Sequence, residues 1–434
     1  MKYLHLAILT GGILGAQCAL PQDFVIQGAT VHTASAKGTL KNTDVVVRGG
    51  IIVAVGAAAG PGAAAGSSAA VGSSAATGSV AKVIDVRGKE LTPGLFGGLT
   101  DIGLEEIEAE AQTVDASLNF KSPEWDQQWR PELDVTVAYN PRSSVVPITR
   151  VEGVTWTVLV PNAGDSIIGG QGSAVVLDGR YDAAMPGSRS LFVQMGATGA
   201  RVAGGSRAAE FMLLEQAIHE ARAPGPAAQG ALLHAAGREA LTHYLMGGRV
   251  VFQVDRAADI LGVIAFAGRN GMKPVILGGD EAWLVAKELA KANVPVILNP
   301  LNDLPSDFDR LGATLENAAR LQRAGVRIAF SSGDTPQARL VRQLAGNAVA
   351  HGLPWEAALA AITSAPADIF GLGATHGRIA VGQSADLVLW NGDPLEVSTL
   401  ADQVWIAGRP IEMKSRQTEL RDRYLEKLKA HQAR

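Results

Sequence analysis

The pattern of apolar and polar positions changes twice along the chain. Between residues 23 and 55, short apolar runs alternate with polar and turn residues, a pattern typical of a small antiparallel β unit. From about residue 95 to residue 365, continuous apolar runs alternate with longer segments of helical periodicity. This order predicts repeated β–α–β units with parallel strands that are buried on both faces. Short strand-like runs return after residue 371.

The middle region predicts enough β–α–β units in succession to favour a closed (β/α)8 barrel over an open sheet. Its expected strands are apolar runs that span 155–160, 249–254, 274–277, 294–298 and 326–330. Its expected helices span 208–220, 257–270, 280–291, 314–324 and 336–351. The short strands after residue 371 and the N-terminal β unit flank this barrel, where they can pair with each other across the molecule.

The two ends of the chain and one internal tract differ from this pattern. Residues 1–19 combine a positive start, a charge-free apolar run and small residues around Cys18, which predicts a secretory signal peptide. We therefore expect a periplasmic or secreted protein; a buried N-terminal helix and a lipidated Cys18 are the alternatives. Residues 57–81 consist almost entirely of Ala, Gly and Ser and predict a flexible insertion in a hairpin loop. Residues 413–434 predict an amphipathic helix that packs on the body.

Composition narrows the classes of protein that this chain can be. Hydrophobic residues make up 47% and charged residues 18% of the 434 residues, which excludes a mainly disordered chain. A net charge of −4 argues against a nucleic-acid partner, and no run is long and charge-free enough to predict a membrane span. A single cysteine excludes an internal disulfide and a cysteine-rich zinc module. The eight histidines lack the i, i+2 or i, i+4 spacing of paired metal ligands.

Four stretches of the chain carry motifs of a known family. They are IDVRGKELTPGL at residues 84–95, DRAADI at 255–260, ITSAPADIFGL at 362–372 and GRIAVGQSADLVLW at 377–390. In this order they resemble the amidohydrolase superfamily, in particular its imidazolonepropionase-like branch. The resemblance implies a distorted TIM (β/α)8 barrel at residues 92–371 and a small composite β-sandwich domain made by residues 20–91 and 372–412. It also implies hydrolysis of amide or cyclic amide C–N bonds, assisted by zinc or another divalent metal.

The chain departs from this family at the positions of the metal ligands. Leu99 and Asp101 replace the His-x-His that the family carries at the end of its first barrel strand. Gln253, Asp255 and Gly278 stand where the resemblance implies further histidines. Leucine and glycine have no side-chain donor atom for a metal. Asp334 remains where the family has an aspartate that serves as metal ligand and general base. We therefore expect no histidine-built metal site and no bound metal cofactor.

The candidate site is a polar, acidic pocket formed by Asp101, Gln253, Asp255 and Asp334. Asp334 is its candidate catalytic residue, and the other three are candidate substrate-pocket residues. Their oxygen atoms suit a hard cation such as Ca²⁺ or Mg²⁺ better than zinc. Each also has a structural alternative. Asp101 and Asp334 can cap a helix or turn, while Gln253 and Asp255 can form a buried polar pair or a salt bridge with Arg207 or Arg256.

Three functions remain open at this point. The first is a metal-free pseudoenzyme or accessory subunit that pairs with an active paralogous amidohydrolase chain. The second is an active hydrolase of C–N bonds with a reduced site around Asp334. The third is a periplasmic barrel that binds a small-molecule ligand at its mouth, because a fold does not by itself determine function. Metal content tests the first, the effect of Asp334→Asn on turnover tests the second, and ligand-dependent thermal stabilisation tests the third.

Overall fold

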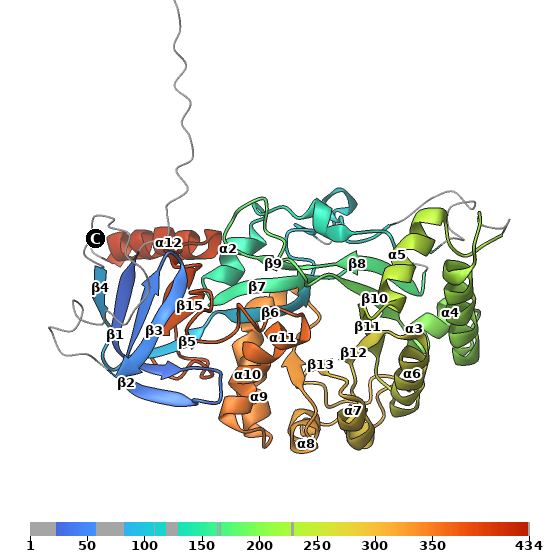
Figure 1. The fold of residues 1–434 in the computed structure, drawn as a ribbon. Helices are drawn as coiled ribbons and strands as arrows, with labels where there is room; N and C mark the ends of the chain where they lie inside the picture. Colours follow the sequence, from blue (N-terminus) through green and yellow to red (C-terminus); the bar gives the residue numbers. More distant parts are fainter. Residues whose placement is uncertain are drawn as a thin grey trace, which may run out of the picture.

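The computed structural model shows a mixed α/β fold, with one sheet built by the two ends of the chain and two sheets built by its middle (Figure 1). The predicted signal peptide at residues 1–19 and residues 58–81 of the predicted insertion lie outside the described residues. The structure describes residues 23–57, 82–107, 109–118, 129–162, 164, 166–226 and 230–432.

An eight-stranded sheet joins the N-terminal and C-terminal parts of the chain. Its strands are β1 (Phe24–His32), β2 (Thr39–Arg48), β3 (Ile51–Ala57), β4 (Lys82–Asp85), β5 (Glu90–Pro93), β15 (Leu387–Trp390), β16 (Ala401–Ile406) and β17 (Arg409–Pro410). Strand β15 pairs antiparallel with β5, with Leu387 opposite Pro93. Phe24 of β1 stacks on Trp405 of β16 at 5.7 Å, although β5 and β15 lie between these strands in the ladder. Since neighbouring strands are about 4.8 Å apart, the sheet must curl around a shared core.

The middle of the chain forms a six-stranded sheet and a three-stranded sheet. The six strands, in spatial order, are β14 (Ile328–Phe330), β13 (Val296–Leu298), β12 (Lys273–Gly278), β11 (Arg249–Val254), β10 (Ser190–Gln194) and β8 (Ile168–Gly172). Strands β10 to β14 pair in parallel, and β8 pairs antiparallel with β10. The smaller sheet contains β6 (Leu95–Thr100), β7 (Val154–Leu159) and β9 (Ala174–Val176).

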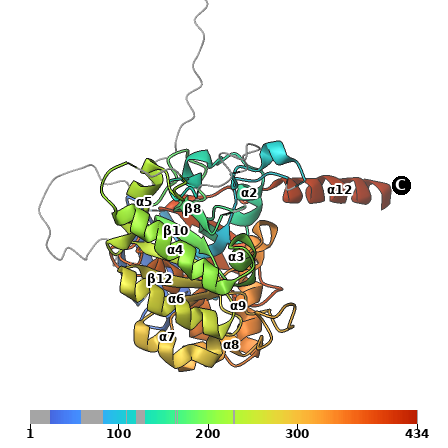
Figure 2. The same ribbon diagram turned by 90° about the vertical axis from the view of Figure 1, so that its right-hand side faces the viewer.

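Helices connect these strands and cover the outer side of the six-stranded sheet, where α4, α6, α7 and α8 lie (Figure 2). Their apolar positions face the strands, as expected for parallel sheets. The helices of the body are α2 (Val145–Arg150), α3 (Gly196–Val202), α4 (Arg207–Arg222), α5 (Ala235–Leu245), α6 (Ala257–Asn270), α7 (Ala286–Ala292), α8 (Asn317–Arg323), α9 (Val341–Ala350), α10 (Trp355–Ala361) and α11 (Ser364–Ile369). Single 3-10 turns are η2 (Ala111–Thr113), η3 (Val135–Ala138), η4 (Ala282–Val285) and η5 (Thr335–Leu340).

The two middle sheets share one apolar interior. One buried cluster includes side chains from both sheets, among them Phe96, Trp156, Phe192, Val251, Val275, Ile297 and Ala329. At one junction the Leu159 N–H donates to the Ser173 carbonyl, and at the other the Leu99 N–H donates to Ser331 Oγ, both over 3.0 Å. Where the sequence predicts one closed eight-stranded ladder, the described ladders therefore form two sheets joined by isolated hydrogen bonds. Strand β6 is irregular, since its register with β7 shifts twice.

Helix α12 (Arg416–Gln432) lies at the C-terminal end and contacts the body near α2. None of its residues is buried, and Tyr424, Leu425 and Leu428 are 63%, 45% and 52% exposed. The helix extends beyond the rest of the molecule (Figure 2), so the expectation that its apolar stripe packs on the body is wrong. Among the described residues, no helix is both long enough and apolar enough to cross a membrane.

Candidate functional site

A cavity of about 720 Å³ opens at the carboxyl ends of the middle strands. The ends of β6, β10, β11, β12 and β13 line it, together with the segments that follow them. This is where the chain directions of parallel strands bring loops together, which is why sites form at this edge. Its apolar floor consists of Leu99, Phe192, Val251, Leu277 and Ile297.

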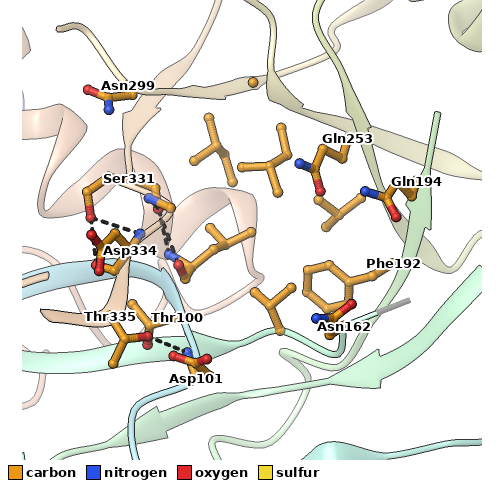
Figure 3. A pocket seen from close by; sticks show the side chains of 18 of the residues that line it. Thr100, Asp101, Asn162, Phe192, Gln194, Gln253, Asn299, Ser331, Asp334 and Thr335 are labelled. Atoms are coloured by element: carbon orange, nitrogen blue, oxygen red, sulfur yellow. Dashed lines mark hydrogen bonds between the residues drawn. The ribbon is translucent and has the colours of Figure 1, made fainter. Parts of the chain in front are cut away.

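All four residues predicted for the site line this cavity: Asp101, Gln253, Asp255 and Asp334. Asp101 and Asp334 lie on one side, and Gln253 lies across from them beside Gln194 (Figure 3). Gln194 is the register partner of Gln253 in the ladder of β10 and β11. Sequence reasoning missed Gln194, although its position at the end of an apolar run is a usable signal. The cavity therefore has an acidic side and an amide-rich side.

The acidic side is held in place by backbone and hydroxyl groups. The Asp101 N–H donates to Thr335 Oγ1 over 2.9 Å, which ties the end of β6 to the segment after β14. Asp334 occupies the position before η5, yet its side chain accepts no capping hydrogen bond. Neither the Asp101 nor the Asp334 carboxylate forms an ion pair or hydrogen bond within the part of the chain that the structure describes. Helix capping therefore does not account for either side chain.

Asp255 is paired, but with a different arginine from those that the sequence suggests. Arg310 lies in the segment after β13, and its Nε and Nη2 atoms are 3.2 Å and 3.1 Å from Asp255 Oδ2. Arg207 and Arg256 instead bind Asp259 of α6, at 3.1 Å and 2.6 Å. The expected salt bridge of Asp255 with Arg207 or Arg256 is thus wrong, because Asp259 faces both arginines one helical turn further along the chain.

Burial and neighbouring charges shift the pKa values of the two carboxyl groups near Arg310. Burial raises the pKa of Asp255 to about 6, and the negative charge of Asp280 adds to this while Arg310 opposes it. Burial likewise raises the pKa of Asp280. Arg310 Nε lies 3.3 Å from Asp280 Oδ2, so a single guanidinium serves two carboxylates. The Arg310 side chain therefore supplies the positive charge beside the Asp255 and Asp280 carboxylates.

The donor set of the cavity does not fit the divalent metal that the family resemblance implies. None of the described residues that line the cavity is a histidine. Leu99 and Gly278 offer no donor atom, and Asp255 is committed to Arg310. Within the described ranges, no group of three or more His, Cys, Asp or Glu side chains is arranged to hold a metal ion. Asp101, Glu105 and Asp334 also line the cavity, but in the described structure these three carboxylates are not arranged to hold one metal ion.

Comparison with known proteins agrees with the sequence motifs. Residues 200–413 match the Amidohydrolase family. The chain is 36% identical over 117 residues to an imidazolonepropionase of Chromobacterium violaceum, a match that covers 26% of this chain and 27% of that protein. It is 52% identical over 58 residues to amidohydrolase tasK of Hapsidospora irregularis, covering 13% of this chain and 6% of that protein. The matched regions thus cover only a small part of the length of these two relatives.

Solved structures show the same fold over nearly the whole chain. An amidohydrolase from Thermotoga maritima superposes with a TM-score of 0.74 at 24% identity, covering 90% of this chain and all of that one. A prolidase complexed with N-methylphosphonate-L-proline superposes with a TM-score of 0.53 at 17% identity, covering 91% of this chain and all of that one. Residues 200–413 thus contain an Amidohydrolase family domain, and a stretch of the chain is homologous to an imidazolonepropionase. The solved structures extend the likeness in fold to nearly the whole chain.

Proposed function

We propose that this protein is a metal-independent member of its superfamily that binds a small polar molecule in the cavity, as a pseudoenzyme or accessory subunit. The main support for this proposal is the pairing of Arg310 with Asp255 and Asp280. Through this pairing the chain supplies its own positive charge at the strand ends. Leu99 and Gly278, which cannot donate to a metal, stand at two family ligand positions. A bound metal would need donor groups that these positions no longer provide.

The two sides of the cavity indicate what a ligand must offer. Asp101 and Asp334 accept hydrogen bonds and attract positive charge, while Gln194 and Gln253 each present both a donor and an acceptor. The apolar floor around Phe192 suits a compact carbon skeleton. These features together support a small molecule with an amine or amide donor at one end and an amide-like group at the other.

Two finer features belong to the same proposal. The apolar cluster shared by both middle sheets supports a distorted TIM barrel whose mouth is the cavity. The composition of residues 1–19 supports export, so that the protein works in the periplasm or outside the cell. An accessory role would bring a related chain with intact metal ligands as its partner. Co-purification of the tagged protein from its native host tests this pairing, and recovery of a stable monomer alone would contradict it.

Metal analysis and ligand-dependent stabilisation test the central proposal. Protein purified from its native compartment without chelators should carry less than one divalent metal ion per chain. Its thermal midpoint should rise with some members of a panel of amino-acid amides and cyclic amides. Asp334→Asn should abolish that rise, whereas Asp422→Asn on the exposed helix α12 should retain it. One or more tightly bound transition-metal ions per chain would overturn the proposal.

An active hydrolase is the second candidate, and the unpaired carboxylate of Asp334 in the cavity favours it. A carboxylate placed this way can accept a proton from an attacking water. In that case Asp334→Asn should abolish turnover of an amide substrate while Asp422→Asn leaves turnover unchanged. Turnover that survives Asp334→Asn rejects this candidate.

A further inference from the structure

Arg310 is the centre of a charge network that spans three segments of the cavity wall. Its Nη2 atom lies 3.1 Å from Asp255 at the end of β11, and its Nε atom lies 3.3 Å from Asp280 after β12. Nε also lies 3.5 Å from Asp307 in the same segment as Arg310. The side chains of Asp255 and Asp280 are only 13% and 1% exposed, so water solvates their charges poorly. The shared guanidinium of Arg310 offsets the cost of burying these two negative charges.

The segment between β13 and α8, which contains Arg310, makes a second contact with the strand ends. Asn302 Nδ2 donates to both carboxylate oxygens of Asp280, over 3.0 Å and 3.1 Å. Asn299, Asn302 and Arg310 all line the cavity. The segment between β13 and α8 therefore forms one wall of the cavity, and the Asp255 and Asp280 carboxylates hold this wall against β11 and β12.

The absence of a side chain at position 278 leaves the space that the Asp255 carboxylate occupies in this network. Gly278 ends β12 with φ of +94°, and a Cβ atom there would lie 2.3 Å from Asp255 Oδ1. Any side chain at this position would force the Asp255 carboxylate to move from the place where it faces Arg310. The histidine that the family resemblance implies at position 278 would therefore disturb the Asp255–Arg310 pair.

We propose that Arg310 is the permanent cation of this site, and that Gly278 and Arg310 are coupled changes which replace a metal-binding wall by an arginine-centred one. The proposal deepens the metal-independent function proposed above and rests on it. Arg310 is a positioning residue: it neutralises the carboxylates at the ends of β11 and β12, and it fixes the wall that carries Asn299 and Asn302. The Asp255–Asp280 pair is then a latent cation site that opens when the guanidinium is removed.

Replacing Arg310 by a neutral side chain of similar length tests the inference. Arg310→Met leaves Asp255 and Asp280 facing each other without a cation, so 1 mM CaCl₂ or MnCl₂ should raise its thermal midpoint by at least about 2 °C. The same salts should leave the wild type within about 1 °C, as a control for unspecific effects. Arg310→Lys retains a positive charge and should not respond. Adding Asp255→Asn to Arg310→Met should remove the response.

Two glycine-to-alanine variants test the steric requirement for glycine at position 278 without changing any charge. Gly278 and Gly247 both have φ of +94°, but a Cβ at Gly247 meets only Lys273 Cε, at 3.9 Å. Backbone strain from φ is therefore common to both alanine variants, and the collision with Asp255 is specific to Gly278→Ala. We expect Gly278→Ala to lower the thermal midpoint clearly more than Gly247→Ala does.

Three results would overturn the inference. They are a folded Arg310→Met protein that ignores divalent ions, a wild type that responds to them as strongly as Arg310→Met does, and equal midpoints for the two glycine variants. The glycine pair decides the matter if Arg310→Met does not fold. These failures are distinguishable from failure of the proposed function, which would appear as metal retained by the native protein.

Discussion

A buried glutamate on helix α4 makes the stability of this protein depend on pH. Glu210 of α4 is 0% exposed, and neither carboxylate oxygen forms a well-aligned hydrogen bond in the described structure. Burial raises its pKa from an ordinary 4.5 to about 7. The charge of Asp259 and, more weakly, that of Asp309 act in the same direction, while Arg207 and the nearby Gly196 N–H oppose them. Arg207 cannot fully compensate, because it already binds Asp259 and Asp309.

The sign and size of the effect follow from this shift. Since the folded state holds the proton more tightly, the stabilising contribution of the protonated group is complete below pH 4.5 and is lost as pH rises to about 7. A pKa that rises from 4.5 to about 7 corresponds to about 3.5 kcal/mol, at roughly 1.4 kcal/mol per pH unit. Glu210→Gln keeps the shape and removes the ionisation. We expect it to stabilise the protein by about 1–3 kcal/mol at pH 8, after the amide's own burial cost.

Urea denaturation monitored by circular dichroism at pH 5 and pH 8 measures this difference. The free energies of wild type and Glu210→Gln should differ little at pH 5 and diverge at pH 8. Glu215→Gln serves as the control, because Glu215 lies on the same helix with a side chain 46% exposed and pairs with Arg269 at the surface. If wild type and Glu210→Gln lose stability in parallel between pH 5 and pH 8, the reasoning about Glu210 is refuted.

Two further substitutions test the packing that supports the cavity. Thr92→Val removes the acceptor of the 2.8 Å hydrogen bond from the Trp390 indole, and the buried N–H left unpaired should lower the free energy of unfolding by about 1–3 kcal/mol in urea titrations. Gly172→Ala places a methyl group 2.0 Å from the carbonyl oxygen of Leu159 between the two middle sheets, and should cost at least about 1–3 kcal/mol. Gly56→Ala meets nothing within 4 Å and should change little; equal effects of the two alanines would contradict the close approach.

The regular elements of the middle region were accessible from the sequence because local periodicity encodes them. The predicted strand 249–254 and helix 257–270 coincide with β11 and α6. The predicted helix 336–351 is instead divided into η5 and α9. Helix α12 shows the limit of the approach, since an amphipathic pattern predicts a helix but not the surface that covers it.

Four residues of the candidate cavity could be predicted from the sequence, but their pairing could not. Strand ends of a parallel sheet meet at one edge, so Asp101, Gln253, Asp255 and Asp334 were expected to share a pocket, and all four line it. Arg310 could not be found this way. It lies 55 positions from Asp255 in a segment without periodicity, and its partner is chosen by packing alone.

Local patterns and motifs encode the class of fold and the resemblance to the amidohydrolase superfamily, so both could be read from the sequence. How the polar side chains at the strand ends are paired depends on packing. Whether a carboxylate at a strand end is free, paired or bound to a metal depends on which distant side chain reaches it once the chain is packed. In this protein Arg310 reaches Asp255 and Asp280, and Gly278 leaves the space that this contact needs.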